Sequence, residues 1–197
     1  LANLDDVNVV KLLSRVIMDL AEGEIKQNLN RYDSGQTFSK YINKSYCKTA
    51  SLIANSAKAA GVLSELNEKN LNMLYEFGKN IGLAFQVVDD ILDFTGNDKQ
   101  LGKPAVSDLA SGYLTAPVLY ALEENEKLSL LINRELSEKD DLNNALEIIM
   151  SSNAIKRSRK LAENFATLSK EALVWLPESE SKRALMALPE FVLSRLY

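Results

Sequence analysis

The stretch FQVVDDILDF, residues 85–94, places three carboxylates inside a run that is otherwise nearly all apolar. On a helix that turns about 100° per residue, Asp89 and Asp93 lie about 40° apart. The same face continues backward through Gln86, Gly82 and Gly78. The opposite side is apolar, through Leu83, Val87, Val88, Ile91 and Phe94. The stretch therefore predicts a helix with one side in the core and the other side presenting carboxylates.

Outward from this stretch, the chain has the composition of an all-α protein. Only 7% of its 197 residues are aromatic, and no proline precedes Pro104. The first half therefore lacks a strong helix breaker other than glycine. Periodic apolar positions and turn residues predict helices over 5–30, from a cap at Thr37 or Ser39 to about 60, and over 68–94, 137–151, 154–175 and 179–194.

Two further boundaries follow from single residues. Gly61 is expected to end the second helix, and Pro117 is expected in the first turn of another helix. Long helices joined by short loops indicate a single all-helical domain over residues 1–197, folded as an all-α helical bundle.

Composition excludes several function classes. The net charge of −4 argues against a nucleic-acid partner, because binding to a phosphate backbone needs a basic surface. One cysteine, Cys47, excludes an internal disulfide, and the absence of histidine excludes His-based catalysis and His-metal sites within this chain. No apolar run approaches the roughly 20 residues that a membrane span needs.

The carboxylates of residues 85–94 are candidate metal ligands. Three carboxylates within five residues raise one another's pKa unless a cation neutralises them. Oxygen ligands alone suit a hard ion such as Mg²⁺, which also binds substrate phosphates. The alternative from these residues is a solvated acidic patch without a ligand.

Lysines supply the opposite charge. Lys40, Lys44 and Lys48 recur every four residues, with Thr49 beside the last. Like charges at this spacing destabilise a helix by a few tenths of a kcal/mol, which indicates an anion nearby. Lys103, in the loop after the carboxylates, could fold back over the same ligand. The alternative is a set of solvated lysines on a helical scaffold that has no ligand.

Three motifs in this order resemble the trans-isoprenyl diphosphate synthases, or polyprenyl synthetases. They are KTASLI at 48–53, GLAFQVVDDILDFTG at 82–96, in which DDILD resembles the second aspartate-rich (DDxxD) motif of that family, and LGKPAVSDL at 101–109. The segments at 9–25, 47–63 and 114–124 are most similar to the solanesyl-type long-chain synthases of cyanobacteria and plastids.

The resemblance implies a helical bundle around a deep central cavity. It also implies a prenyltransferase that uses Mg²⁺ to condense isopentenyl diphosphate with an allylic diphosphate. Lys48 and Thr49 would bind the allylic diphosphate, with Gln86 beside the reacting centre and Lys103 closing over the diphosphate. Asp89 would be the main metal ligand, with Asp90 and Asp93 binding directly or through water. The resemblance further implies a homodimer. The single cysteine fits a reducing compartment, and we expect the cytoplasm, or the plastid stroma if the source is a plant.

One family feature is absent from these 197 residues. The first aspartate-rich motif has no counterpart, because LDDVN at 4–8 lacks the third carboxylate. We therefore expect the chain to be the C-terminal two-thirds of a longer synthase, and we expect no turnover from these residues alone. The alternative is a non-catalytic regulatory subunit of the same fold that naturally lacks this motif.

Overall fold

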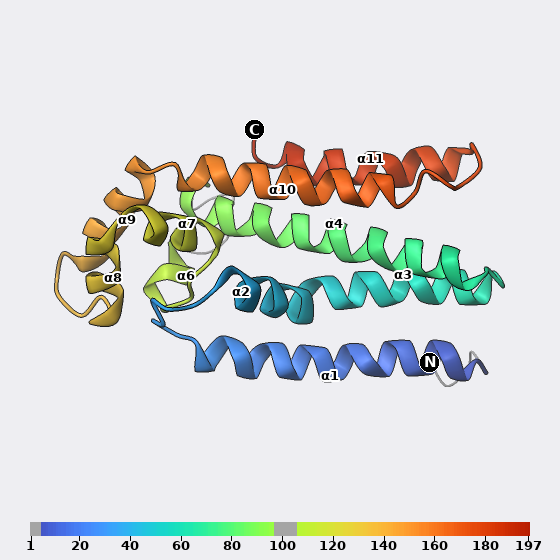
Figure 1. Ribbon diagram of the computed structural model, residues 1–197, viewed down its shortest axis with the longest axis horizontal. Coiled ribbons are helices and arrows are strands. Elements are labelled where there is room, and N and C mark those ends of the chain that lie inside the picture. Colours follow the sequence, from blue (N-terminus) through green and yellow to red (C-terminus); the bar gives the residue numbers. More distant parts are fainter. Residues whose placement is uncertain (1–4, 97–105) are drawn as a thin grey trace.

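The structure is a computed structural model that describes residues 5–96 and 106–197, and these residues form helices and no strands. Figure 1 shows the long helices running along the molecule, with the short helices gathered at one end. The elements are α1 (Val7–Leu29), α2 (Phe38–Ser45), a π-helical turn (Tyr46–Ala50), α3 (Ser51–Leu63), α4 (Glu68–Thr95), α6 (Ser107–Ala110), α7 (Ala116–Glu124), α8 (Glu126–Asn133), α9 (Asp141–Ser151), α10 (Ala154–Glu171) and α11 (Glu180–Ser194). The all-α prediction is confirmed.

Local capping explains where the helices begin. The Asp6 carboxylate accepts hydrogen bonds from the backbone N–H groups of Asn8 and Val9, at 2.8 and 3.0 Å, and α1 follows. The Thr37 hydroxyl accepts from the N–H of Lys40 at 3.3 Å and caps α2, as one of the two predicted caps. Pro117 lies in the first turn of α7, also as predicted.

Two predicted helix boundaries are wrong. Gly61 does not end a helix, since α3 continues to Leu63. A Cβ at Gly61 would lie 2.8 Å from the side chains of Leu71 and Leu74, so this glycine makes room for α4 packing. The helix expected over 137–151 begins at Asp141, and α8 precedes it without having been predicted. Arg134 forms ion pairs with Glu138 and Asp141 and so holds this junction.

The core surrounds α4, which packs chiefly between α3 and α10. The side of α4 predicted to be apolar is buried, with Val87, Val88 and Ile91 fully inaccessible to solvent. Burying each such side chain contributes about 1.5–3 kcal/mol relative to leaving it exposed. None of the helices in the described ranges is both long and apolar enough to cross a membrane.

Two glycines bring α4 unusually close to the segment that contains the π turn. A Cβ at Gly82 would lie 2.6 Å from the Cα of Ala50, and one at Gly78 would lie 2.6 Å from the carbonyl oxygen of Ile53. Real Cβ atoms do not approach backbone this closely, so any side chain here would push the two helices apart. The glycine face therefore receives a neighbouring backbone, and this contact sets Thr49 against α4.

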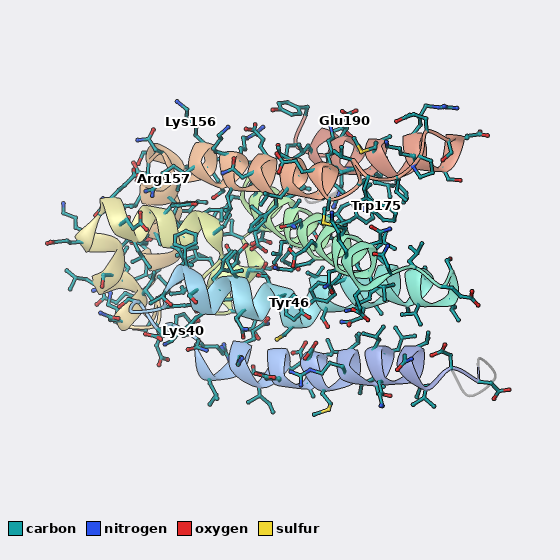
Figure 2. All side chains as sticks on the ribbon, turned by 45° about the vertical axis from the view of Figure 1, so that its right-hand side comes forward. Lys40, Tyr46, Lys156, Arg157, Trp175 and Glu190 are labelled. Atoms are coloured by element: carbon teal, nitrogen blue, oxygen red, sulfur yellow. The ribbon has the colours of Figure 1, made fainter. Side chains whose placement is uncertain are left out.

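The π turn changes the register of the helix that carries the lysines. The N–H of Ser51 donates to the carbonyl of Tyr46, one residue further back than in an α-helix. Figure 2 shows Tyr46 on this turn, between α2 and α3, and Lys40 near the start of α2. Side chains on either side of the turn are therefore rotated relative to the regular pattern that the sequence alone predicts.

Ion pairs hold the short helix α7 against α10. Arg157 of α10, labelled in Figure 2, pairs with Glu123 at 2.6 Å and Glu124 at 3.3 Å, both in α7. Its guanidinium also lies 4.1 Å from the ring centroid of Tyr120. These contacts hold the C-terminal half of α7 against α10.

Candidate active site

Two adjoining pockets lie against the C-terminal half of α4. The larger cavity has a volume of about 770 Å³ and is bounded by Asp89 of α4, by Arg159 of α10 and by Arg195 after α11. The smaller pocket, of about 170 Å³, is bounded by Lys44 and Lys48. Both are lined by the same three polar residues, Gln86, Asp90 and Asp108. A ligand at this shared wall would contact acidic and basic groups together.

Asp89 lies at the edge of the larger cavity, with 37% of its side chain exposed. Its carboxylate forms an ion pair with Arg195, at 2.7 Å between Oδ1 and Nη2. The Arg195 guanidinium also lies 4.7 Å from the ring centroid of Phe85, one turn earlier on α4. A cationic group therefore already lies where the sequence predicts a metal ion.

Asp90 is buried and hydrogen-bonded, with 3% of its surface exposed. It accepts from the Tyr41 hydroxyl at 2.7 Å and from Gln86 Nε2 at 2.9 Å. Burial raises its pKa to about 6, although Lys44, Tyr41 and Gln86 act to lower it. The protein alone thus stabilises the charge of Asp90 incompletely, and a cation in the cavity would complete it.

Gln86 links the π turn to Asp90. The Thr49 hydroxyl donates to Gln86 Oε1 at 2.6 Å, and this bond orients the amide so that its nitrogen donates to Asp90. The three predicted residues Thr49, Gln86 and Asp90 therefore form one hydrogen-bonded chain. The close approach at Gly82 makes this chain geometrically feasible, because it brings Thr49 directly onto α4.

Asp93 differs from the other two carboxylates. It is completely buried, and it lines neither of the two pockets. Its oxygens accept from the Ser107 hydroxyl and the Asp108 N–H, each at 3.2 Å, and its carbonyl accepts from the N–H of Val106 at 2.8 Å. Asp93 thus anchors the segment 106–108 and positions Asp108 on the shared wall.

The lysine series is divided among different partners. Lys40 lies 3.6 Å from Asp33, away from both pockets. Lys48 pairs with Glu24 at 2.7 Å and donates to Gln27 at 2.8 Å, both on α1, while also lining the smaller pocket. Lys103, the remaining predicted site residue, lies outside the described residues.

Lys44 lies between these two lysines and lines the same pocket as Lys48. Burial lowers the pKa of Lys44, against the opposing effect of Asp90 and Asp108. The two lysines closest to α4 are therefore the ones that reach the site.

Sequence reasoning missed several residues of the site. Arg159 and Arg195 are far from any motif, and no local pattern connects them to α4. Lys44 and Asp108 could have been assigned, since one belongs to the lysine series and the other to the motif at 101–109. The π turn after Lys44 alters which side of that segment faces the pocket, and Asp108 is placed by the hydrogen bond from its N–H to Asp93.

Asp89 and Asp90 fit a divalent cation. Both residues line the larger cavity, and the guanidinium of Arg195 already provides a positive charge at Asp89. Within residues 5–96 and 106–197, no group of three His, Cys, Asp or Glu side chains is arranged to hold a metal ion. Two protein carboxylates with a phosphate-bearing ligand would suit Mg²⁺, which commonly takes one or two carboxylates and keeps several waters.

The site thus places carboxylates and cationic side chains around joined polar pockets within an all-α bundle. The chain belongs to the polyprenyl synthetase family, whose sequence model matches residues 1–149. This match confirms the resemblance predicted from the three motifs.

Relatives and a solved structure agree with this assignment. The chain is 54% identical over 197 residues to a prenyl transferase of Synechocystis, covering 100% of the chain and 61% of that protein. It is 45% identical over 196 residues to solanesyl-diphosphate synthase 2, chloroplastic, of Oryza sativa, covering 100% of the chain and 49% of the relative.

The solved structure is a polyprenyl synthase from Caulobacter crescentus complexed with calcium and isoprenyl diphosphate. It matches with a TM-score of 0.90 at 30% identity, over 100% of the chain and 61% of that protein. The chain thus spans at most 61% of each of these three proteins.

Proposed function

We propose that the full-length protein is a Mg²⁺-dependent trans-polyprenyl diphosphate synthase, which condenses isopentenyl diphosphate with an allylic diphosphate. The observation that carries this proposal is the shared wall of Gln86, Asp90 and Asp108 between a cavity edged by Asp89 and a pocket edged by lysines. The names of the Synechocystis and Oryza relatives support it, as does the isoprenyl diphosphate bound by the Caulobacter protein.

The reaction breaks one bond and forms another. The C–O bond of the allylic diphosphate breaks, and its electron pair leaves with the diphosphate. The double bond of isopentenyl diphosphate then attacks the allylic carbon, and the product loses a proton to form a new double bond. A protein accelerates such a step by stabilising the departing negative charge and by keeping water away from the allylic cation.

The described residues can supply these effects. Asp89 and Asp90 would hold Mg²⁺, whose bound charge neutralises part of the negative charge on a diphosphate. Lys48 and Lys44 would bind phosphoryl oxygens through charge-assisted hydrogen bonds. Gln86, fixed by Thr49, would present an oriented amide dipole beside the reacting carbon. Asp93 would act through Asp108 and the chain after it, and Lys103 would close over the diphosphate.

A homodimer is part of the same proposal. Several apolar side chains of α1 are more than 60% exposed, namely Val7, Ile17, Met18, Ile25 and Leu29. Exposed apolar surface of this extent is typical of contact surfaces. Light scattering on the full-length protein would measure the mass. The name of the Oryza relative, which includes the word chloroplastic, also fits a plastid location if the source is a plant.

The test is a condensation assay on the full-length protein with labelled isopentenyl diphosphate and an allylic diphosphate. We expect labelled polyprenyl diphosphate with Mg²⁺ and none with EDTA. Absence of product under both conditions would contradict the proposal. If the protein then altered the output of a catalytic synthase mixed with it, the regulatory-subunit alternative would replace it.

A further inference from the structure

Thr115 carries a buried hydroxyl that the fold does not use. It lies at the N-cap position of α7, with φ −97° and ψ 176°, but its side chain makes no capping hydrogen bond. The residue is 3% exposed, and its Oγ1 has no hydrogen-bond partner in the part of the chain that the structure describes. A buried hydroxyl without a partner lowers stability, because it has lost its hydrogen bonds to water.

Thr37 shows what the same residue does when its hydroxyl serves the fold. It lies at the N-cap of α2 with similar backbone angles, φ −89° and ψ 155°, and its hydroxyl accepts from the N–H of Lys40. At α7 the corresponding donor is the N–H of Val118, three residues after Thr115, and Pro117 before it has no N–H. Thr115 makes no capping bond, so its hydroxyl remains available to another partner.

The smaller pocket indicates what kind of partner the Thr115 hydroxyl could bind. Thr115 lines it together with Ser45, whose buried Oγ also lacks a hydrogen-bond partner of normal geometry. Burial raises the pKa of the neighbouring Tyr41 phenol, and Ser45 lies near enough to oppose that rise. Lys44 and Lys48 line the same pocket. Its volume of about 170 Å³ exceeds the roughly 30 Å³ share of one water several-fold, so a phosphoryl group can enter.

We propose that the Thr115 hydroxyl donates a hydrogen bond to a phosphoryl oxygen of a diphosphate held by Lys44 and Lys48. This inference rests on the proposed function and adds Thr115 to its binding residues. Lys44 and Lys48 attract an anion at their side of the pocket, opposite the wall of Asp90 and Asp108, and a hydroxyl donor with no other acceptor disfavours an apolar ligand. The diphosphate could be that of the allylic substrate or the inorganic diphosphate released from it, since both present the same oxygens.

The experiment compares Thr115→Val, Thr115→Ser and Thr37→Val in the full-length protein. Calorimetric titration with inorganic diphosphate in Mg²⁺ should show a Kd raised roughly 10-fold in Thr115→Val and little changed in Thr115→Ser, because only valine removes the donor. Without ligand, Thr115→Val should melt at or above the wild-type temperature. Thr37→Val should melt about 2–4 °C lower and bind diphosphate normally.

A second titration uses an allylic thiolodiphosphate, which binds but reacts slowly. Weaker binding of both probes to Thr115→Val supports a contact shared by substrate and product, and weaker binding of the thiolodiphosphate alone supports a contact to the substrate only. Ser45→Ala should weaken binding in the same direction without any change in α7, and this variant keeps the test decisive if Thr115→Val folds poorly.

Unchanged Kd values for both probes in Thr115→Val would overturn the inference, because the Thr115 hydroxyl would then make no hydrogen bond to the diphosphate. A fall in melting temperature like that of Thr37→Val would also overturn it, since the hydroxyl would then serve the fold. In either case wild-type binding and product formation would continue. Failure of the proposed function is distinguishable, because the wild-type protein would then neither bind diphosphate nor form product.

Discussion

On the arginine side of the site, defined by Arg159 and Arg195, the guanidinium of Arg195 lies 2.7 Å from the Asp89 carboxylate. On the lysine side, defined by Lys44 and Lys48, the pocket also contains the unpartnered hydroxyl of Thr115. The first side is edged by a cavity of about 770 Å³ and the second by a pocket of about 170 Å³.

This difference indicates how a ligand would bind on each side. A cation that approaches Asp89 must replace the ion pair with Arg195. Its binding free energy is therefore the difference between the new interaction with the carboxylate and the lost one. Lys48 on the lysine side is likewise paired, with Glu24 and Gln27, but a phosphoryl group there would also meet the Thr115 hydroxyl, which has no other acceptor, so this one hydrogen bond would be a full gain in binding free energy. On the arginine side a metal ion would therefore exchange with the guanidinium of Arg195, whereas on the lysine side a phosphoryl group would bind to a hydroxyl donor that has no partner to lose.

The largest effect is expected at Asp89 on the arginine side. Asp89→Ala in the full-length protein should lower kcat roughly 100- to 1000-fold, because it removes charge stabilisation that matters most as the diphosphate departs. Its stability should change by no more than about 1 kcal/mol, since the pair with Arg195 is partly exposed. Steady-state kinetics and chemical denaturation measure the two quantities.

Asp141 provides the matched control for Asp89. It is also paired with an arginine, Arg134, but it is 1% exposed and lies at the start of α9, outside both pockets. Asp141→Ala should therefore lower stability and leave kcat per folded molecule unchanged. Equal kcat in Asp89→Ala and wild type at saturating Mg²⁺ would remove Asp89 from the metal site.

The next effect concerns Asp90, which lies between the two sides. Its folded-state pKa of about 6 is above the ordinary value of 3.8, so the folded protein holds this proton more tightly than the unfolded chain does. Its contribution to the free energy of unfolding is therefore fully present below about pH 4 and falls as the pH rises to about 6, by about 3 kcal/mol in total. Urea denaturation in EDTA across this range measures the loss.

Asp90→Asn separates this carboxyl from all other groups that titrate in the same range. The variant should lack the fall in stability between pH 4 and pH 6 that the wild type shows. Added Mg²⁺ should reduce the fall in the wild type, because a bound cation favours the ionised carboxylate. The same pH profile in both proteins would show that Asp90 is not the group responsible.

A smaller effect is expected at Lys48 on the lysine side. Lys48→Ala should lower kcat/KM for the allylic diphosphate roughly 10- to 100-fold, with contributions from both KM and kcat, because its charge matters more as the diphosphate leaves. Lys40→Ala is the control, since Lys40 belongs to the same lysine series but pairs with Asp33 instead. A change confined to the KM for isopentenyl diphosphate would mean that Lys48 serves the other substrate.

Local rules were sufficient for much of the fold. The long helix predicted over 68–94 is α4, Glu68–Thr95, because its apolar period and lack of proline leave no other local solution. The cap at Thr37 and the position of Pro117 are predictable because a capping hydroxyl and a proline each act on the adjoining helical turn. The prediction that Gly61 ends a helix is wrong, because this glycine is required by its close contact with Leu71 and Leu74 of α4 and not by a helix end.

The site was predicted less completely than the fold. A helical wheel can place Asp89, Asp90 and Asp93 on α4, but it cannot show that residues 106–108 return to bury Asp93. It also assumes a regular helix, and the π turn Tyr46–Ala50 breaks that assumption beside Lys48. The arginine side joins residues more than 100 positions apart in sequence, where periodicity carries no information.

The smallest effect is expected at Arg195, and it tests whether the arginine side works by exchange. Arg195→Gln in the full-length protein removes the positive charge that lies 2.7 Å from Asp89, so a metal ion no longer competes with it. Because a partly exposed ion pair is worth about 0.2–1 kcal/mol, Mn²⁺ used as a probe in the absence of diphosphate should bind up to about 5-fold more tightly. Electron paramagnetic resonance titration of free Mn²⁺ measures this directly, and Arg183→Gln, on α11 and remote from the carboxylates, controls for the loss of one positive charge. The lysine-side variant Lys48→Ala should show no comparable tightening, since Lys48 pairs with Glu24 of α1 rather than with Asp89. If Arg195→Gln binds Mn²⁺ as weakly as the wild type does, the guanidinium does not occupy the position of the ion, and the two sides of the site do not differ in the way proposed here.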